Sequence, residues 1–399
     1  MAIVGRPHSA EGNNDHGLFG RSLAAVSMTS AKEIYHSLSS IFANRKSDEV
    51  LEIEILTPES GPLLQDGLCI GITKAALVKA FLIARQKLTR YLTQLKENTV
   101  NGGLPDESDE ANELSIATQI ILLFDCEHVT ACNWRKRYIS SSMQQYDNQY
   151  ESRHLEDLLQ RETTLLSSFQ CSPLHRHTKS PTLWQHRLWI MGKLLNLKEQ
   201  NAMAYDPLCR LILKELDVVC KSGQLHPRNY YAFSYMRQLH ALVCRYSSSK
   251  EGVSREEVLG DGSQALLLDL AILMIEPVLK WCLSNPSDIS GWMYLFYLLD
   301  CDRQMMNSPS MQEDRMIAER IVVMKRTIQF AVHIATWEGE SLWTFVDLML
   351  ARFGNGILPT ADIARLELAN SLPTSGARWK TTKLGVYKTY EGMRDESIS

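Results

Sequence analysis

The residues best suited to chemistry lie in the segment Lys179–Ile190, where a lysine precedes a sharply defined helix start. Ser180 occupies the N-cap position, and Pro181 occupies the first turn, where a missing backbone N–H costs nothing. A lysine at this place adds to the positive end of the helix dipole and can stabilise negative charge. Four neighbours would enlarge the positive patch, namely His175, Arg176, His177 and Arg187. The alternative interpretation is a solvated basic turn that binds nothing.

Other patterns that carry chemistry are absent. His175 and His177 have no third or fourth ligand nearby in the sequence, which argues against a metal site. The nine cysteines form no C-x-x-C pair, and this odd, scattered set is typical of reduced thiols. A Gly-rich phosphate loop, G-x-S-x-G and H-E-x-x-H are missing, which argues against an independent kinase or hydrolase. We therefore expect no metal and no cofactor in this chain.

The composition of the 399-residue chain, with 45% hydrophobic and 22% charged residues, is that of a soluble globular protein. Single cores rarely exceed roughly 250–300 residues, so we expect two domains or one elongated array. The net charge of −4 argues against nucleic acid or a membrane surface as the main partner. No apolar run reaches the ~18 residues of a membrane helix, so we expect no transmembrane segment.

The chain divides into four expected segments. Residues 1–30 mix charges with Gly, Ser and Asn, which predicts a disordered leader rather than a signal peptide. Residues 31–112 predict a helical segment with a Gly-rich linker, residues 113–355 an array of helices, and residues 356–399 a C-terminal helix and basic tail. A short strand is expected at Val50–Leu56, without an obvious partner. Because strand signal is nearly absent after residue 60, the predicted fold class is all-α.

The helices follow an internal repeat. When the helix starts are aligned, one equivalent position is occupied successively by Cys132, Trp184, Phe233, Trp292 and Trp343. The intervals are about 50 residues, and each contains two helices, which predicts an array of helical hairpins. Such hairpins stack into a right-handed superhelix, here a crescent-shaped solenoid with an extended binding surface. We expect the five repeated side chains to be core residues between hairpins rather than ligand contacts.

Polar residues at fixed offsets in the repeat are candidates for binding. Three residues after the motif position, the five copies carry Arg135, Arg187, Met236, Leu295 and Val346, so only the first two keep a charge. The third copy begins with Arg228-Asn229-Tyr230, where Asn229 either caps the helix or contacts a ligand. The run Arg135-Lys136-Arg137 is either a solvated face or a surface for an acidic partner.

These residues resemble the alpha-subunit repeat of protein prenyltransferases, whose pattern is roughly Pro-x-Asn-Tyr-x-x-Trp-x-x-Arg-Arg. The second copy, Lys179-Ser-Pro-Thr-Leu-Trp-Gln-His-Arg, and the third, Pro227-Arg-Asn-Tyr-Tyr-Ala-Phe, carry the likeness best. It covers roughly residues 30 to 370 and is closest to the divergent branch of protein prenyltransferase alpha subunit repeat-containing proteins.

The resemblance implies a function for the whole chain. In that family the alpha subunit wraps around a beta subunit, which holds the catalytic zinc and the isoprenoid. The resemblance therefore implies a cytoplasmic alpha-type subunit of a heterodimeric geranylgeranyltransferase that selects proteins with a C-terminal cysteine. It places Lys179 beside the leaving group of the prenyl diphosphate co-substrate. It also makes five residues candidates for contact with substrate or partner, namely Arg135, Arg187, Arg228, Asn229 and Tyr230.

Two other interpretations stay open. One is a tetratricopeptide-like interaction scaffold without enzymatic activity, although those repeats run at about 34 residues rather than 50. The other is an alpha subunit that binds a beta subunit without supporting catalysis, because three of the five copies lack the positioned arginine.

Overall fold

A computed structural model describes residues 31–97, 109–145, 149–200, 205–248, 261–301, 311–335, 337, 339–354 and 357. It confirms the all-α class. The described residues of 31–45 and 55–124 form one compact unit, and those of 46–54 and 125–357 form another. The expected leader (1–30), most of the Gly-rich linker (98–108) and, apart from Ile357, the expected C-terminal helix and basic tail lie outside the described residues.

The first unit packs three helices against one another, α2 (Ala31–Asn44), α3 (Lys74–Glu97) and α4 (Asp109–Phe124). Its apolar contacts include the stacked rings of Phe81 and Phe124, whose centroids lie 4.1 Å apart. The Lys87 ammonium lies 5.3 Å from the centre of the Tyr35 ring and pairs with Glu113. These contacts join all three helices.

A small sheet precedes α3 and corrects the sequence analysis. Strands β1 (Glu52–Leu56), β2 (Leu63–Asp66) and β3 (Cys69–Thr73) are arranged in the order β1-β3-β2, and a 3-10 turn, η1 (Pro58–Ser60), follows β1. The expectations that the first strand lacks a partner and that strand signal ends near residue 60 were wrong. β2 and β3 pair antiparallel around Gly67, whose positive φ of 57° suits a tight turn. The hairpin escaped notice because its strands are short and do not alternate apolar with polar residues.

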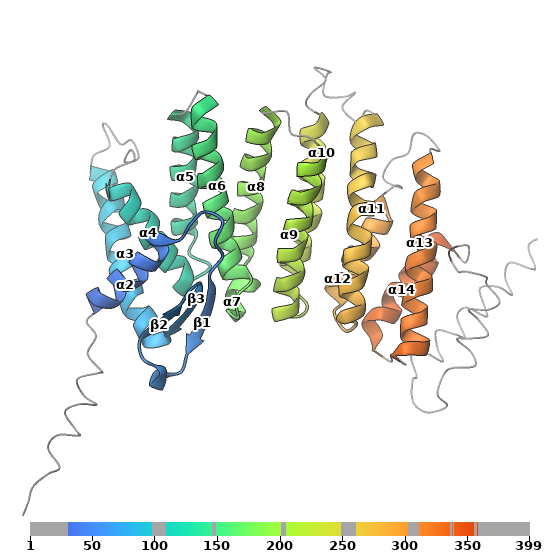
Figure 1. Cartoon of the computed structure of the whole chain (residues 1–399), viewed down its shortest axis with the longest axis horizontal. Helices are drawn as coiled ribbons and strands as arrows, with labels where there is room; N and C mark the ends of the chain where they lie inside the picture. Colours follow the sequence, from blue (N-terminus) through green and yellow to red (C-terminus); the bar gives the residue numbers. More distant parts are fainter. Residues whose placement is uncertain are drawn as a thin grey trace, which may run out of the picture. The chain divides into compact units, whose positions relative to one another are not determined.

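The second unit is a series of paired helices, drawn in chain order in Figure 1. They are α5 (Val129–Gln145), α6 (Gln149–Gln170), the single turn α7 (His175–Thr178), α8 (Pro181–Gln200), α9 (Tyr205–Leu225), α10 (Tyr230–Ser248), α11 (Asp261–Ser284), α12 (Ile289–Leu299), α13 (Met311–Gln329) with its π-turn η4 (Phe330–Ile334), and α14 (Glu340–Phe353). The expected helices of the repeat are thus present in the described residues.

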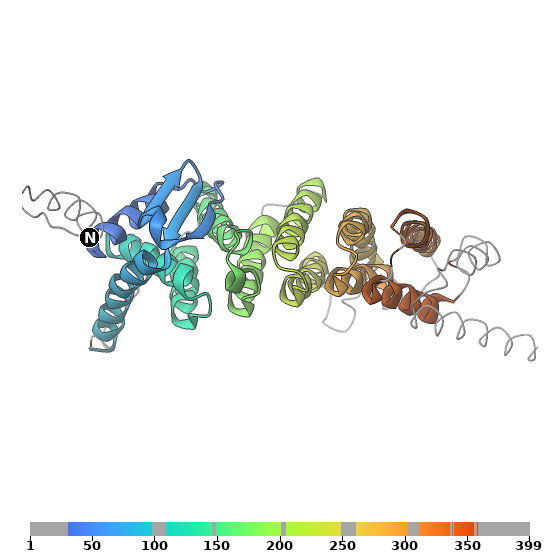
Figure 2. The same ribbon diagram turned by 90° about the horizontal axis from the view of Figure 1, so that it is seen from below.

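The helices of this unit form two rows, which Figure 2 shows end-on. We call α6, α9, α11 and α13 the A helices and α5, α8, α10, α12 and α14 the B helices. Each A helix packs on the B helix that follows it, as α6 does on α8 and α9 on α10. Helices of one row also contact their neighbours, as α8 contacts α10 and α10 contacts α12. Stacking of this kind gives each hairpin a core that it could not bury alone.

The repeated motif side chains form that core. Cys132, Trp184, Phe233, Trp292 and Trp343 are all buried. The aromatic ring at the motif position of one copy lies against the ring that stands two residues after the motif position of the next copy. The pairs are Trp184 with Tyr235 at 5.1 Å, Phe233 with Tyr294 at 5.7 Å, and Trp292 with Phe345 at 5.0 Å between centroids. Each such ring pair stabilises the fold by about 1 kcal/mol beyond the effect of burying its apolar area.

Candidate functional site

The first arginine of the motif lies inside the array. Arg135 on α5 donates from Nε to Oε1 of Glu162 on α6 at 2.8 Å, and it also forms a salt bridge with the second carboxylate oxygen. Nε2 of His186 on α8 lies 2.7 Å from the same Oε1. Burial would raise the pKa of Glu162, but the Arg135 charge and the hydrogen bonds from Arg135 and His186 outweigh it and lower that pKa. The carboxylate therefore stays charged and links three helices.

The second arginine repeats this arrangement one copy further on. Arg187 on α8 forms a bidentate pair with Glu215 on α9, with N–O distances of 2.6 and 2.8 Å. Its Nη1 donates to the Thr163 carbonyl and to the side-chain oxygens of Ser167 and Gln170. The Tyr235 hydroxyl on α10 also donates to Glu215. The Arg187 side chain is 1% exposed, and each of its three nitrogens donates to a partner within the chain.

The third copy fills the same place with apolar atoms. Met236 and Met274 are fully buried, and the Tyr294 hydroxyl lies 3.3 Å from the Met274 sulfur. Tyr294 and Met274 are twenty residues apart, as are Tyr235 and Glu215. Met274 is therefore the counterpart of Glu215. In the last two copies the arginine position holds Leu295 and Val346, which are also buried.

The turn before each B helix joins that copy to the one before it. Four cap residues stand four positions before the motif residue, and the side chains of three reach the preceding turn. Ser180 accepts from the Leu183 N–H at 3.1 Å and donates to the Cys126 carbonyl at 3.1 Å. Asn229 likewise accepts from the Ala232 N–H and donates to the Thr178 carbonyl. Asp288 accepts from the N–H groups of both Ser290 and Arg228, and His128 caps α5. Capping and docking of neighbouring copies are therefore performed by the same side chains.

Lys179 forms a defined structural contact in this series of turns. The indole N–H of Trp184 donates to the carbonyl six residues earlier, and the indoles of Trp292 and Trp343 do the same at 2.8 to 3.0 Å. The Phe233 ring, unlike an indole, has no N–H to donate. At the carbonyl that lies six residues before it, Pro227, the donor is Nζ of Lys179, at 2.9 Å. The lysine thus replaces the indole that the third copy lacks.

Lys179 stands among other cationic and aromatic side chains, which we call the turn patch: Lys179, His175, His226, Arg228, Tyr230 and Tyr231. The rings of His175 and His226 meet edge to face at 4.7 Å. Burial lowers the pKa of His226, and the charges of His175 and Lys179 add to that effect. Arg228 has a positive φ of 62°, and its backbone N–H donates to Asp288 at 2.7 Å, while its side chain is exposed.

The structure separates the residues that the sequence grouped as binding candidates. Lys179 is partly exposed, and Arg228 and Tyr230 are exposed on the same turn. Arg135, Arg187 and Asn229 are buried, and each is engaged by partners within the chain. Their burial favours a structural role over direct contact with a substrate or partner. This burial could not be predicted from the sequence, because the carboxylates that pair with the arginines lie 27 and 28 residues away.

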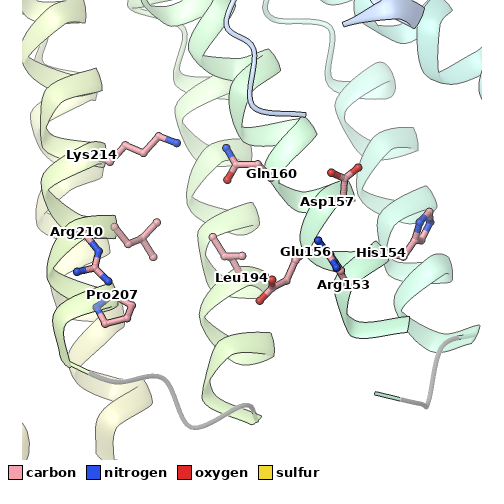
Figure 3. A pocket seen from close by; sticks show the side chains of 10 residues that line it. Arg153, His154, Glu156, Asp157, Gln160, Leu194, Pro207, Arg210 and Lys214 are labelled. Carbon is pink, nitrogen blue, oxygen red and sulfur yellow. The ribbon is translucent and has the colours of Figure 1, made fainter. Parts of the chain in front are cut away.

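A groove that sequence reasoning missed lies between α6 and α9, with α8 beneath it (Figure 3). Its volume is about 760 Å³. In Figure 3, Arg210 and Lys214 lie on one wall, and Glu156 and Asp157 lie on the other, with Leu194 between them. The groove occupies the first halves of α6 and α9, whereas the turn patch follows their ends. No motif marks it, since only the packing of distant helices brings its walls together.

Two further findings bear on function. Within the described ranges, no three or more His, Cys, Asp or Glu side chains are grouped so that they could hold a metal ion. Of the helices that the structure describes, none combines the length and the apolar character that crossing a membrane requires.

Comparison with known families identifies the repeat. The model of the protein prenyltransferase alpha subunit repeat matches residues 212–242 and 275–302, which correspond to the two hairpins α9–α10 and α11–α12. A comparison with curated proteins found no match. The third and fourth copies are thus similar to alpha subunit repeats, and the same buried motif position extends to the copies on either side.

Proposed function

We propose that this chain, which carries protein prenyltransferase alpha subunit repeats, is the alpha-type subunit of a heterodimeric protein prenyltransferase of the geranylgeranyl type. The observation that carries the proposal is the match to that repeat within a continuous array of hairpins with one shared core. Arrays of this kind present long surfaces to other proteins. The chain would scaffold a beta subunit and help to select cytoplasmic substrate proteins with a C-terminal cysteine.

The proposal divides the chemistry between two subunits. The described part of this chain offers no group of metal ligands, so the residues present do not fit a zinc site, and we assign zinc and the prenyl pocket to the partner. Zinc lowers the pKa of a coordinated thiol and so favours the nucleophilic thiolate. This chain would contribute cationic groups from the turn patch to the diphosphate.

Lys179 is the group that we assign to the leaving diphosphate. An ammonium has three N–H donors, and the Pro227 carbonyl uses one of them. The side chain is partly exposed, and its carbonyl contact fixes the position of Nζ at the mouth of the turn. His175 and Arg228 add cationic or titratable groups nearby. A cation held in place stabilises charge that develops on a leaving group more effectively than a mobile one.

The test combines binding and activity. The full chain is co-expressed with a prenyltransferase beta subunit, and the purified complex is assayed for prenyl transfer to a protein that ends in cysteine. Lys179→Ala is expected to lower kcat by about 100-fold. The control is Lys221→Ala, which removes an exposed lysine from α9. Failure to bind any beta subunit contradicts the whole proposal, whereas full activity of Lys179→Ala contradicts only the role of the lysine.

The contact between Lys179 and Pro227 favours a second candidate, a non-catalytic interaction scaffold. In that case the lysine serves only as the missing indole donor, and its loss changes stability alone. Lys179→Gln separates the two roles, because glutamine keeps an N–H donor for the Pro227 carbonyl but removes the charge that a diphosphate would need. If the chain is only a scaffold, the wild-type chain still binds its partner, but the complex has no transferase activity.

A further inference from the structure

Charge is divided between the two rows of the helix array. The B helices α5, α8, α10 and α12 contain no Asp or Glu apart from Glu199, near the end of α8. The A helices α6, α9, α11 and α13 all contain several acidic residues. These four consecutive B helices lie side by side and present basic and aromatic side chains without intervening carboxylates, whereas the fifth B helix, α14, carries Glu340 and Asp347.

The cations of the B row repeat in register. Lys136 lies four residues after the motif position of its copy, and its Nζ is 5.9 Å from the ring centre of Trp189, five residues after the motif of the next copy. Arg237 and Tyr297 occupy the same two positions two copies later, with the guanidinium 5.8 Å from the ring centre. Nζ of Lys193 also lies over Trp189, 5.4 Å from the centre of that ring. We call Lys136, Trp189, Lys193, Arg237 and Tyr297 the B-row stripe.

The stripe lacks the counter-charges found elsewhere. On the A row, Arg315 pairs with Asp269 at 2.9 Å, and Arg326 pairs with Glu276. In the parts of the chain that the structure describes, Lys136, Lys193 and Arg237 form no such pair and rest on aromatic faces instead. Burial lowers the pKa of Arg237, which means that this partly exposed cation has lost hydration without gaining a carboxylate. Such cations are ready to accept carboxylates from another molecule.

The surroundings of the stripe suit a protein partner rather than a polyanion. Leu188 and Phe296, which occupy the position of Lys136 in the second and fourth copies, are partly exposed. Arginine, aromatic and apolar side chains together are typical of the centre of protein interfaces. Nucleic acid or anionic lipid instead favours many flexible, fully solvated cations.

We propose that the B-row stripe on α5, α8, α10 and α12 is the docking surface for an acidic face of the beta subunit. This inference rests on the proposed function and adds to it the row of helices and the charge chemistry of the contact. Carboxylates of the partner would approach Lys136, Lys193 and Arg237, while its apolar atoms cover Trp189 and Tyr297. Opposite charge would also steer the approach of the two subunits, so association should weaken as salt increases.

The test compares charge reversals on the two rows in the full chain. Lys136→Glu/Arg237→Glu changes the B-row stripe, and Lys280→Glu/Lys325→Glu makes the same charge change at exposed positions on the A helices α11 and α13, away from the groove. We expect the B-row variant to raise the Kd for the beta subunit by about 100-fold, and the A-row variant to change it by less than about threefold. Circular dichroism checks that both variants fold.

Each outcome decides the proposal. Equal weakening by both variants, or none by the B-row variant, overturns the docking surface while leaving the proposed function intact. A wild-type chain that binds no beta subunit overturns both. If the B-row reversal unfolds the chain, the neutral Lys136→Gln/Arg237→Gln variant replaces it and must show a shallower dependence of Kd on salt. Loss of binding to phosphatidylserine vesicles, with beta-subunit binding unchanged, would assign the stripe to a membrane and contradict the proposal.

Discussion

The two halves of the helix array occupy one fold position with opposite chemistry. In the first half, Arg135 with Glu162 and Arg187 with Glu215 form buried ion pairs between copies. From the third copy on, the arginine position is held by methionine, leucine and valine. Removing charges from water costs several kcal/mol per ion, which the attraction between them roughly offsets. The comparison shows that the fold does not need the charges, whereas a charge that is present needs its partner.

The largest effect is expected when one pair is broken. Glu215→Met alone leaves Arg187 buried without a counter-charge and should lower the free energy of unfolding by about 4 kcal/mol. The double variant Arg187→Met/Glu215→Met copies Met236 and Met274 of the next interface, and we expect stability within about 1 kcal/mol of wild type. Urea denaturation measures both. A double variant as unstable as the single one would show that the two halves are not interchangeable.

Acid should destabilise the first half of the helix array before the second half. The lowered pKa of Glu162 means that its contribution is present above the pKa of the unfolded chain, about 4.3, and is lost as pH falls toward the folded value. Burial lowers the pKa of His186 despite its bond to Glu162, so protonation below about pH 6.5 also disfavours the folded state. Both signs predict lower stability in acid. Hydrogen exchange between pH 7 and pH 3, a range that extends below the unfolded pKa of glutamate, should show α5, α6 and α8 losing protection before α12 and α14.

That experiment has an internal control. Glu162→Gln removes the titrating carboxylate and should flatten the pH dependence of exchange in α6, although it destabilises the chain at pH 7. Simultaneous loss of protection in both halves would contradict the assignment of acid sensitivity to the buried pair.

A smaller effect concerns the caps. The Asn229 side chain caps α10 and also bonds the Thr178 carbonyl and the Ser222 hydroxyl, whereas Gly339 at the same position of the last copy has no side chain. Asn229→Ala should therefore cost about 2 kcal/mol. Ser341→Ala, which removes an exposed bond to the Ser287 carbonyl, should cost less than about 0.5 kcal/mol. Equal costs in thermal unfolding would show that the later copy docks as tightly as the earlier one.

The smallest effect concerns the replaced indole. Lys179→Met removes the donor to the Pro227 carbonyl and should lower stability by about 1 kcal/mol, with Lys221→Met as the unaffected control. Chemical denaturation of the isolated chain measures this without reference to activity. An unchanged midpoint would mean that water replaces Nζ at no cost.

Much of the fold could be predicted from local signals. Ser180 and Pro181 mark the start of α8, and Asp206-Pro207 marks the beginning of α9, because caps and first-turn prolines act within a few residues. The spacing of Trp184, Trp292 and Trp343 predicts a buried position, since one side of each helix must face the neighbouring copies. The β2–β3 hairpin escaped because short strands carry little periodic signal.

Only part of the candidate site could be predicted from the sequence. Lys179 stands out by its place before a helix start, but its contact with Pro227 depends on how two turns pack. Nothing near Arg187 in the sequence indicates Glu215, so an inward pair and an outward binding residue look alike. The same holds for the groove between α6 and α9, whose walls come from separate hairpins.

The sequence by itself determined the helices, their caps, the repeat and its buried aromatic positions, because these follow from contacts within a turn or from a period along the chain. Only the tertiary structure decided which charged side chains are buried and which groups they contact. Packing turned Arg135 and Arg187 inward against carboxylates of the next copy and laid Lys136 and Arg237 on the rings of the next B helix. No periodicity in the sequence indicates which residue will pair with a given charged side chain. The energy of that charge depends on the atoms that bury it and on the opposite charges nearby, and the stacking of the copies determines both.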